Sequence, residues 1–195
     1  MVRTVSVGRK RDTRGRILDA ALRIISREGA AHLTLESVAA EATLSKGGLL
    51  YHYTSKQALI QGLLVRKLAE FDAMRQMAWD NLHEGPNRAL LAELMAALDL
   101  KRFEPGVGQA ILAASAESPS LLDPVRLHRQ QRLARIRSDA SDGDCAELLM
   151  LAADGLFFAI VLGIGPTERD LDHINRLRLL LLDKARADEA IANCA

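Results

Sequence analysis

The stretch that decides the fold of this chain is TRGRILDAALRIISREGAAHLTLESVAAEATLSKGGLLYHYTSKQAL, residues 13–59. Its first part predicts a helix over residues 13–28, because apolar side chains recur there at helical spacing, namely Leu18, Ala21, Leu22 and Ile25. Gly29 comes directly after this helix and is placed to end it with a left-handed cap. The stretch therefore begins with an amphipathic helix that needs a packing partner.

A second, shorter helix is predicted after Thr34, whose hydroxyl suits an N-cap. Glu36 falls in the first turn, where a negative charge is favourable. The apolar positions again follow helical spacing, at Leu35, Val38, Ala39 and Ala42. A break at residues 42–44 separates this helix from the next one.

A third helix is predicted over residues 45–53, with Ser45 as its N-cap and with Leu49 and Tyr53 on one face. Because that face packs against the two preceding helices, other residues must face outward: Gly47, Gly48 and Tyr51. Glycines in a first turn cost about 1 kcal/mol each relative to alanine, but they let a phosphate or a base edge approach the backbone. The outward face is therefore a candidate DNA-binding surface.

Side chains around this outward face fit the same function. Lys46 and Lys56 flank it, and several side chains near it donate hydrogen bonds of the kind that phosphates and bases accept: Thr34, Ser45, Tyr51 and His52. A plain three-helix packing unit is the alternative. For single residues, His52 as a structural histidine and Lys56 as a solvated lysine also stay open.

The rest of the chain is predicted to be helical as well. Thr54 and Gln57 form a T-x-x-Q capping box that begins a fourth helix ending near Leu82. Further helices are expected over residues 87–102, 107–117, 119–139, 144–164 and 168–187. Aromatic residues make up only 4% of the chain whereas Leu and Ala abound, which favours an all-α protein.

The opening stretch resembles the N-terminal domain of the TetR/AcrR family of bacterial transcriptional regulators. The resemblance lies in R-I-L-D-A-A at residues 16–21, S-K-G-G-L-L-Y-H-Y at 45–53 and S-K-Q-A-L at 55–59. It implies an all-α fold of about nine helices in two domains. These are an N-terminal three-helix helix-turn-helix DNA-binding domain, residues 1–57, and a C-terminal helical ligand-binding and dimerisation domain, residues 58–195. Residues 1–12 show no apolar periodicity and are expected to form a mobile basic arm.

The resemblance assigns contacts with DNA phosphates or bases to Thr34, Ser45, Lys46, Gly47, Gly48, Tyr51, His52 and Lys56. Two positions depart from the family pattern. Thr43 stands where the family has glycine, so a β-branched residue is expected to take the turn conformation at positive φ. Leu50 replaces a tyrosine, so that one aromatic phosphate contact is either missing or replaced by an apolar contact with a thymine methyl group.

Charge is divided unevenly along the chain, although the net charge is only +1. Residues 1–60 hold ten Lys or Arg against five acids, whereas residues 61–195 hold sixteen against twenty. The basic end fits a polyanionic partner. Its first basic residues are either a solvated tail or contacts to the DNA backbone or minor groove: Arg3, Arg9, Lys10, Arg11, Arg14 and Arg16.

The last helices are expected to form a homodimer. Residues 145–163 are apolar almost all round, and the next helix carries apolar residues at helical spacing. In the family, the last two helices pair with those of a second subunit, which implies a dimer interface at Leu156, Ile160, Leu171, Ile174, Leu177 and Leu181. Burial within one subunit is the alternative. Asp154 interrupts the apolar run, which favours a buried soluble helix over a membrane span.

The resemblance also implies a pocket for a small-molecule effector of unknown identity. The candidate lining residues are large and apolar, and core packing is the alternative for each: Phe71, Met74, Trp79, Met95 and Phe103. Asp154 would either balance a cationic ligand or pair with a neighbouring arginine, and we favour the pair.

Other classes of function have little support. The two cysteines, Cys145 and Cys194, form neither a disulfide framework nor a zinc-type spacing. The chain has no zinc-protease, phosphate-loop or nucleophile-elbow pattern, so we expect no catalytic residue, metal or cofactor. The N-terminus has no apolar leader, and a cytoplasmic location without membrane partners is expected.

The expected function is a ligand-responsive repressor that a small-molecule effector releases from palindromic double-stranded DNA, its operator. A helical enzyme, a helical interaction protein that does not bind DNA, and a membrane-surface protein remain as alternatives.

Overall fold

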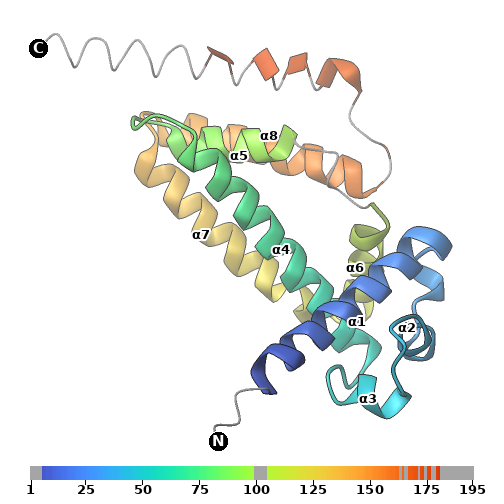
Figure 1. Cartoon of the computed structure of the whole chain (residues 1–195). Coiled ribbons are helices and arrows are strands. Elements are labelled where there is room, and N and C mark those ends of the chain that lie inside the picture. Colours follow the sequence, from blue (N-terminus) through green and yellow to red (C-terminus); the bar gives the residue numbers. More distant parts are fainter. Residues whose placement is uncertain are drawn as a thin grey trace, which may run out of the picture. The chain divides into compact units, whose positions relative to one another are not determined.

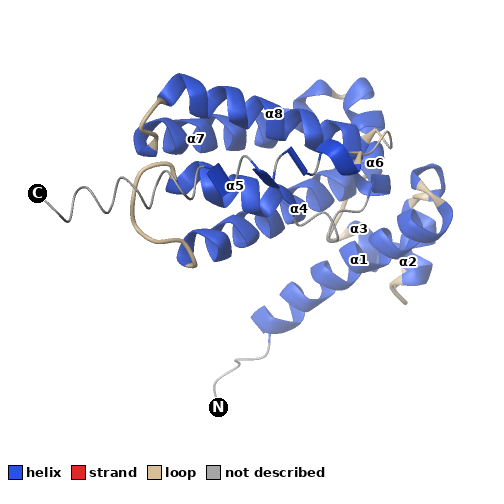
Figure 2. Cartoon of the chain, turned by 90° about the horizontal axis from the view of Figure 1, so that it is seen from above, coloured by secondary structure: helices blue, strands red, loops and turns tan. Residues whose placement is uncertain are grey.

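The computed structural model describes residues 6–98 and 105–162, together with 164, 167–170, 172–173, 175–176 and 179–180. All regular elements within these residues are helices (Figure 2). In chain order they are α1 (Ser6–Glu28), η1 (Ala30–His32), α2 (Leu35–Glu41), α3 (Lys46–Leu50), α4 (Lys56–Asp80), α5 (Arg88–Leu98), α6 (Pro105–Glu117), η3 (Pro119–Leu122), α7 (Asp123–Asp139) and α8 (Gly143–Val161) (Figure 1). The predicted all-α fold is confirmed. None of the helices in this part of the chain combines the length and apolar character that a membrane crossing needs.

Helix α1 begins earlier than predicted. It starts at Ser6 and not near Thr13, so residues 6–12 of the predicted arm are helical, while residues 1–5 lie outside the described part. The prediction relied on apolar periodicity, which this polar segment lacks. Arginine and lysine are nevertheless good helix formers, and extending an existing helix gains a hydrogen bond for each residue added.

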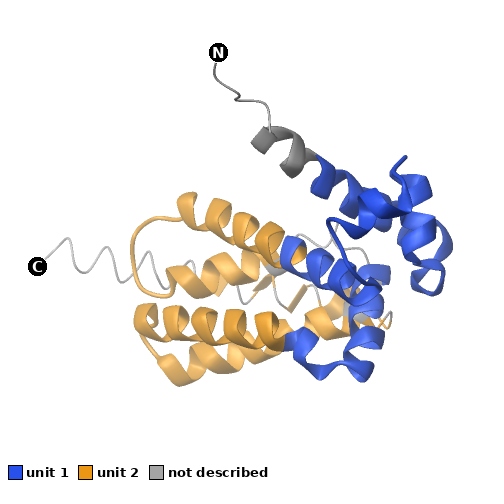
Figure 3. Ribbon diagram, turned by 90° about the horizontal axis from the view of Figure 1, so that it is seen from below, with its two compact units in different colours: residues 1–66, 104–122 blue, residues 67–103, 123–195 orange. Residues whose placement is uncertain are grey.

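The chain divides into two compact units, which Figure 3 colours separately. Unit 1 comprises residues 1–66 and 104–122, and unit 2 comprises residues 67–103 and 123–195. Helix α4 thus contributes to both units, and α6 and η3 are grouped with the N-terminal helices. The domain boundary expected after residue 57 stays a prediction.

The core of unit 1 is built from the apolar positions that the sequence pattern singled out. Helices α1 to α4 bury Ile17, Leu18, Ala21, Ile24, Ile25, Val38, Ala39, Leu49, Leu59 and Leu63. Helix α6 packs against α1 and η1 and adds Val107, Ala110 and Ile111. At the surface, Glu41 of α2 forms ion pairs with Arg23 and Arg27 of α1, at 2.7 and 3.2 Å. The three N-terminal helices therefore form one packed group.

Helix α4 is capped by Ser55 and not by the predicted Thr54. The Ser55 Oγ accepts a hydrogen bond of 3.0 Å from the backbone N–H of Ala58. The Gln57 amide, which was expected to close a capping box, donates to the Ser118 Oγ at 2.5 Å. A partner distant in sequence thus replaces the local one.

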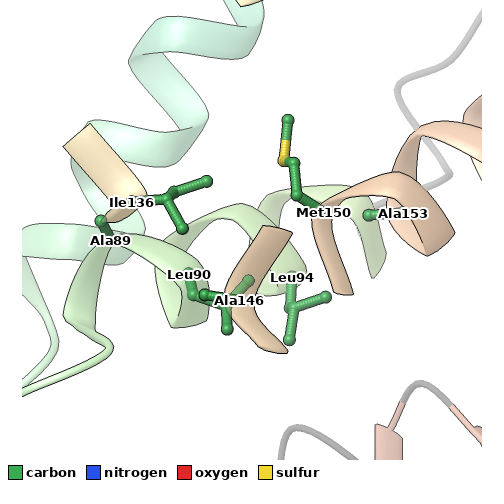
Figure 4. Packing of buried hydrophobic residues seen from close by; sticks show 7 residues of the cluster. All are labelled: Ala89, Leu90, Leu94, Ile136, Ala146, Met150 and Ala153. Carbon is green, nitrogen blue, oxygen red and sulfur yellow. The ribbon is translucent and has the colours of Figure 1, made fainter. Parts of the chain in front are cut away.

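The core of unit 2 is formed by α5, α7 and α8 (Figure 4). Its buried members are Ala89, Leu90, Leu94, Ile136, Ala146, Met150 and Ala153. The last residue of α7 also satisfies a backbone N–H group in the first turn of α5, because the Asp139 carboxylate accepts a 2.6 Å hydrogen bond from the Ala89 N–H. This anchored three-helix packing supports the side chains of α4, α5 and α7 described below.

Candidate functional site

Two short helices of unit 1, α2 and α3, are each fixed at their N-terminus by a side chain that the sequence predicted. The Thr34 Oγ1 accepts from the backbone N–H of Ser37, and the Ser37 hydroxyl reciprocates toward the Thr34 N–H, both at 3.0 Å. The Ser45 Oγ accepts from the Gly48 N–H at 3.1 Å. Both predicted N-caps are confirmed. Each hydroxyl is thereby engaged with its own helix.

The turn between α2 and α3 depends on Thr43. Its φ angle is +56°, the left-handed conformation expected from the missing glycine. Across the turn, the Leu44 N–H donates to the Ala39 carbonyl oxygen at 2.9 Å. The guanidinium Nη2 of Arg16 in α1 donates to the Ala42 carbonyl oxygen at 3.0 Å. The turn is therefore held from outside by the first helix.

Helix α3 is shorter than the predicted range of 45–53. It ends at Leu50, and the backbone N–H groups of His52 and Tyr53 then both donate to the Leu49 carbonyl oxygen, at 2.9 Å. The two predicted inward side chains, Leu49 and Tyr53, are buried. The two glycines in the first turn and the turn after Leu50 account for so short a helix.

Tyr51, on the predicted outward face of α3, is exposed as expected: 68% of its surface is accessible to solvent. Gly47 is exposed and has open space where a Cβ would stand, whereas Gly48 and Leu50 are half-buried. His52 is half-buried, and its ring meets the Tyr51 ring edge-on at 5.2 Å between centroids. Tyr51 and Gly47 thus offer the most open contact area on this face.

The lysines of this surface differ in their surroundings. The Lys46 Nζ lies 2.7 Å from the Glu36 Oε1 of α2. The hydrogen bond from Lys46 holds the pKa of the Glu36 carboxyl below its usual range, and the same contact raises the pKa of the Lys46 amine. Lys56 is exposed and has no ion-pair partner among the described residues. Sequence reasoning did not predict that Glu36 pairs with Lys46, although the few residues between the two helices could have suggested this contact.

Two arginines assigned to the basic arm are structural. Arg16 holds the Ala42 carbonyl, as described above, and the Arg14 guanidinium lies 5.3 Å from the centroid of the buried Tyr53 ring. Both side chains therefore support the helix pair from α1. Both residues are exposed but belong to α1 and not to an unstructured tail, and a contact of either with the DNA backbone stays a prediction.

Unit 2 contains a cavity of about 300 Å³ between side chains of α4, α5 and α7. Of the predicted effector residues, Trp79 lines it. Phe71, Met74, Met95 and Asp154 are not part of this lining, and Phe103 lies outside the described residues. Phe71 instead packs edge-on against Phe157 at 5.5 Å between ring centroids. Asp154 pairs with Arg129 at 3.1 Å, in agreement with the favoured interpretation.

The cavity lining is mostly polar or charged, which the search for apolar residues missed. Buried Glu93 of α5 accepts hydrogen bonds from Arg132 of α7 at 2.8 and 2.5 Å and lies 3.2 Å from the Arg75 Nε of α4. Asp72 contacts Arg75 and His128, and these hydrogen bonds outweigh partial burial and keep the pKa of the Asp72 carboxyl below its usual value. The recurrence of arginine every third residue along α7 was the available signal: Arg126, Arg129, Arg132 and Arg135.

Helix α8 has two apolar faces. One is buried in unit 2 and carries Ala146, Met150 and Ala153. The other is exposed and repeats at three- and four-residue intervals through Leu148, Leu151, Gly155 and Phe158, and Leu162, directly after the helix, continues this spacing. Of the predicted dimer residues, Leu156 is half-buried, and the side chains of Ile160, Leu171, Ile174, Leu177 and Leu181 lie outside the described residues. The repeat in the sequence could have identified this exposed face directly.

Two capped helices joined by a tight turn and packed on a third helix define a helix-turn-helix protein. Residues 17–63 match the family model for bacterial regulatory proteins of the tetR family, and residues 87–182 match the model for the tetracyclin repressor-like C-terminal domain. The chain belongs to the TetR family of bacterial regulatory proteins.

Individual relatives agree with this assignment. The HTH-type transcriptional regulator UidR of Escherichia coli K12 is 34% identical over 99 residues, covering 43% of this chain and 50% of UidR. The chain thus spans about half the length of this curated relative. The curated proteins that match the chain are HTH-type transcriptional regulators.

Solved structures share the fold at low sequence identity. A TetR transcription regulator from Haloarcula marismortui has a TM-score of 0.70 at 17% identity, with 90% of this chain and 98% of that chain covered. A transcriptional regulator from Saccharomonospora viridis, solved in complex with choline, has a TM-score of 0.67 at 20% identity, with 89% and 96% covered. These likenesses extend over both units of the chain.

Proposed function

We propose that the chain is a dimeric, cytoplasmic repressor that binds operator DNA through α2 and α3 and responds to a small molecule bound in unit 2. The observation that carries the DNA-binding role is the α3 face, where Tyr51 projects into solvent beside Gly47 while the opposite side of the helix is buried. An exposed tyrosine leaves its apolar ring in water, and its hydroxyl can donate to a phosphate oxygen or a base.

Several residues of this surface serve as contacts in the proposal: Thr34, Ser45, Lys46, Gly47, Gly48, Leu50, Tyr51, His52 and Lys56. The Ser45 hydroxyl caps α3 through the Gly48 N–H, and Gly47 beside it has open space where a Cβ would stand, so a phosphate can approach the backbone there. Leu50 and His52 are half-buried and are therefore positioned to touch DNA only at its closest approach.

Dimerisation is proposed through the exposed apolar face of α8. Leu148, Leu151 and Phe158 are 67%, 47% and 53% exposed, so a second copy of this face would remove a continuous apolar stripe from water. A two-fold dimer places two recognition helices about 34 to 36 Å apart, on successive turns of a palindromic operator.

The ligand response is proposed for the unit 2 cavity. The choline complex of the Saccharomonospora viridis regulator indicates that a protein of this fold accommodates a small molecule. In this chain the cavity is lined by α4, and α4 also contributes to unit 1. A ligand that favours one position of α4 would thereby change the spacing of the two α3 helices and release the operator.

The DNA-binding role is tested with the DNA directly upstream of the gene, titrated by fluorescence anisotropy at two salt concentrations. We expect specific binding that weakens at higher salt, and a Tyr51→Ala variant that binds at least about tenfold more weakly. Ser26→Ala, at an exposed position of α1, is the matched control and should bind as the wild type does. Operator affinity unchanged by Tyr51→Ala would mean that the wrong face has been chosen.

A further inference from the structure

The carboxylates of the unit 2 cavity are already occupied. Both oxygens of Glu93 accept hydrogen bonds from Arg132, and one of them also lies 3.2 Å from Arg75. Asp72 is engaged with Arg75 and with His128. A cationic ligand entering the cavity would therefore find no free carboxylate and would have to displace an arginine from one.

Arg135 lines the cavity but is paired with neither Glu93 nor Asp72. Three arginines and two carboxylates line the cavity, and Arg75 and Arg132 account for both carboxylates. Arg135 has no carboxylate partner among the described residues, and its guanidinium lies 4.1 Å from the centroid of the Trp79 ring. The lining therefore carries a surplus positive charge whose hydrogen-bond donors remain available to a ligand.

Trp79 offers little to a cation. A tryptophan ring in a cavity often attracts a positive ligand through its π-face. Here the Arg88 guanidinium already lies 4.4 Å from the ring centroid, in addition to that of Arg135. Arg88 is further fixed by hydrogen bonds of 3.2 and 2.9 Å to the Trp79 carbonyl oxygen. A cationic ligand would thus compete with two arginines for this ring.

We infer that the effector is a small organic anion, whose carboxylate or phosphate group pairs with Arg135 while its remaining part lies in the cavity beside Trp79. This inference rests on the proposed ligand response and specifies its chemistry. Arginine binds planar oxyanions through two parallel hydrogen bonds, which a neutral amide matches poorly and an amidinium not at all. The proposed effector is therefore opposite in charge to the choline bound in the Saccharomonospora viridis structure.

Three probes of nearly equal size and different charge test the inference on the full chain: benzoate, benzamide and benzamidine. Trp79 is the only tryptophan of the chain, so its fluorescence reports binding in the cavity directly. We expect benzoate to bind at least about tenfold more tightly than benzamide, and benzamidine to bind weakest. Calorimetric titration supplies the same dissociation constants independently of any change in fluorescence.

Variants of α7 locate the charge preference. Arg135→Gln is expected to weaken benzoate binding about tenfold and to leave benzamide binding unchanged, whereas Arg135→Lys keeps part of the preference. Arg137→Gln is the matched control, since it removes an equal charge from the same helix at a residue that pairs with Glu147 and does not line the cavity. The wild-type probe series needs no variant and stands even if Arg135→Gln fails to fold.

The inference is overturned if benzamidine binds as tightly as benzoate, if none of the three probes binds, or if Arg135→Gln leaves benzoate binding unchanged in a folded protein. The operator titration is performed on the same preparations and separates this result from the proposed function. Specific DNA binding without a preference for benzoate would reject the anionic effector and leave the regulator intact. A clear benzoate preference without DNA binding would support the anionic effector and reject the DNA-binding role.

Discussion

The Arg16 guanidinium donates a 3.0 Å hydrogen bond to the Ala42 carbonyl oxygen, 26 residues later in the chain, and so joins the first helix to the turn of the helix-turn-helix. The next residue, Thr43, has a φ of +56°, which glycine adopts without strain and a β-branched residue does not. A tertiary contact from α1 therefore adjoins the one residue of the turn whose backbone conformation is strained.

Replacing Thr43 with glycine should raise the free energy of unfolding by about 0.5 to 1 kcal/mol. The left-handed conformation costs an ordinary residue roughly 1 to 2 kcal/mol, and the greater freedom of glycine in the unfolded chain returns part of that gain. Urea unfolding followed by circular dichroism measures the change. Ala40→Gly, in the last turn of α2, is the control and should lower the free energy of unfolding by up to about 1 kcal/mol. Equal destabilisation by both variants would contradict the strain at Thr43.

Replacing Gly62 with alanine should destabilise unit 1 by about 1 to 3 kcal/mol, the usual cost of overpacking. A Cβ at Gly62 would stand 2.6 Å from the Cε1 atom of Tyr53. Tyr53 is only 4% exposed, so its ring has little room to move away. Gly15→Ala in α1 is the matched control, because nothing lies within 4 Å of its added Cβ and alanine is the better helix former. Thermal unfolding should rank Gly15→Ala above the wild type and Gly62→Ala below it.

Acid should weaken the connection between α1 and α2. Hydrogen bonds from Arg23 and then Arg27 hold the pKa of Glu41 below its usual value. The ionised Glu41 side chain therefore contributes fully to stability above the pKa of an ordinary glutamate, about 4.3, and this contribution is lost as the pH falls through the lowered pKa. We expect Glu41→Gln to be less stable than the wild type at neutral pH, with the difference shrinking towards acid pH. Chemical unfolding across this pH range measures it. Glu84→Gln, at an exposed position without an ion pair among the described residues, should show no such trend.

Local patterns predicted the fold well wherever the determining contacts are close in sequence. The N-caps Thr34 and Ser45 and the buried face at Leu49 follow from neighbouring residues, and the structure has them as expected. Gln57 was misjudged because its partner, Ser118, is 61 residues away. The start of α1 was misjudged because apolar periodicity does not register a polar helix.

The effector cavity was the least predictable part, for a physical reason. Apolar side chains such as Met74 were expected to line it, but apolar residues of a helical bundle serve mainly to pack against one another, as Phe71 does against Phe157. Charged residues become cavity residues only when several helices bring them together, as α4, α5 and α7 do around Glu93. A pattern within one helix does not contain that information.

Disrupting the exposed face of α8 should dissociate the proposed dimer. Phe158→Glu places a charge in the middle of the apolar stripe, where it would be desolvated in the dimer without a partner. Light scattering after gel filtration should show a monomer at concentrations where the wild type is dimeric. Leu127→Glu is the control, because Leu127 is a 57% exposed leucine of α7 outside this stripe. Dissociation by both variants, or by neither, would contradict the assignment of the interface.

Replacing Glu36 with glutamine should strengthen DNA binding. Lys46 is held by Glu36 at 2.7 Å, so a phosphate must compete with this carboxylate for the amine, and the carboxylate itself repels the DNA backbone. We expect operator affinity to rise about twofold to fivefold at low salt, with non-operator DNA gaining similarly because phosphate contacts carry no sequence information.

The salt dependence identifies the cause of that gain. If Lys46 takes up a phosphate contact that Glu36 prevents in the wild type, the variant releases about one more counterion and its slope against log salt steepens by about 0.9. Glu84→Gln removes the same charge outside unit 1 and should change neither affinity nor slope. Weaker operator binding by Glu36→Gln would contradict competition for Lys46. It would indicate that the Glu36 carboxylate itself contacts the DNA, for example by accepting a hydrogen bond from the amino group of cytosine.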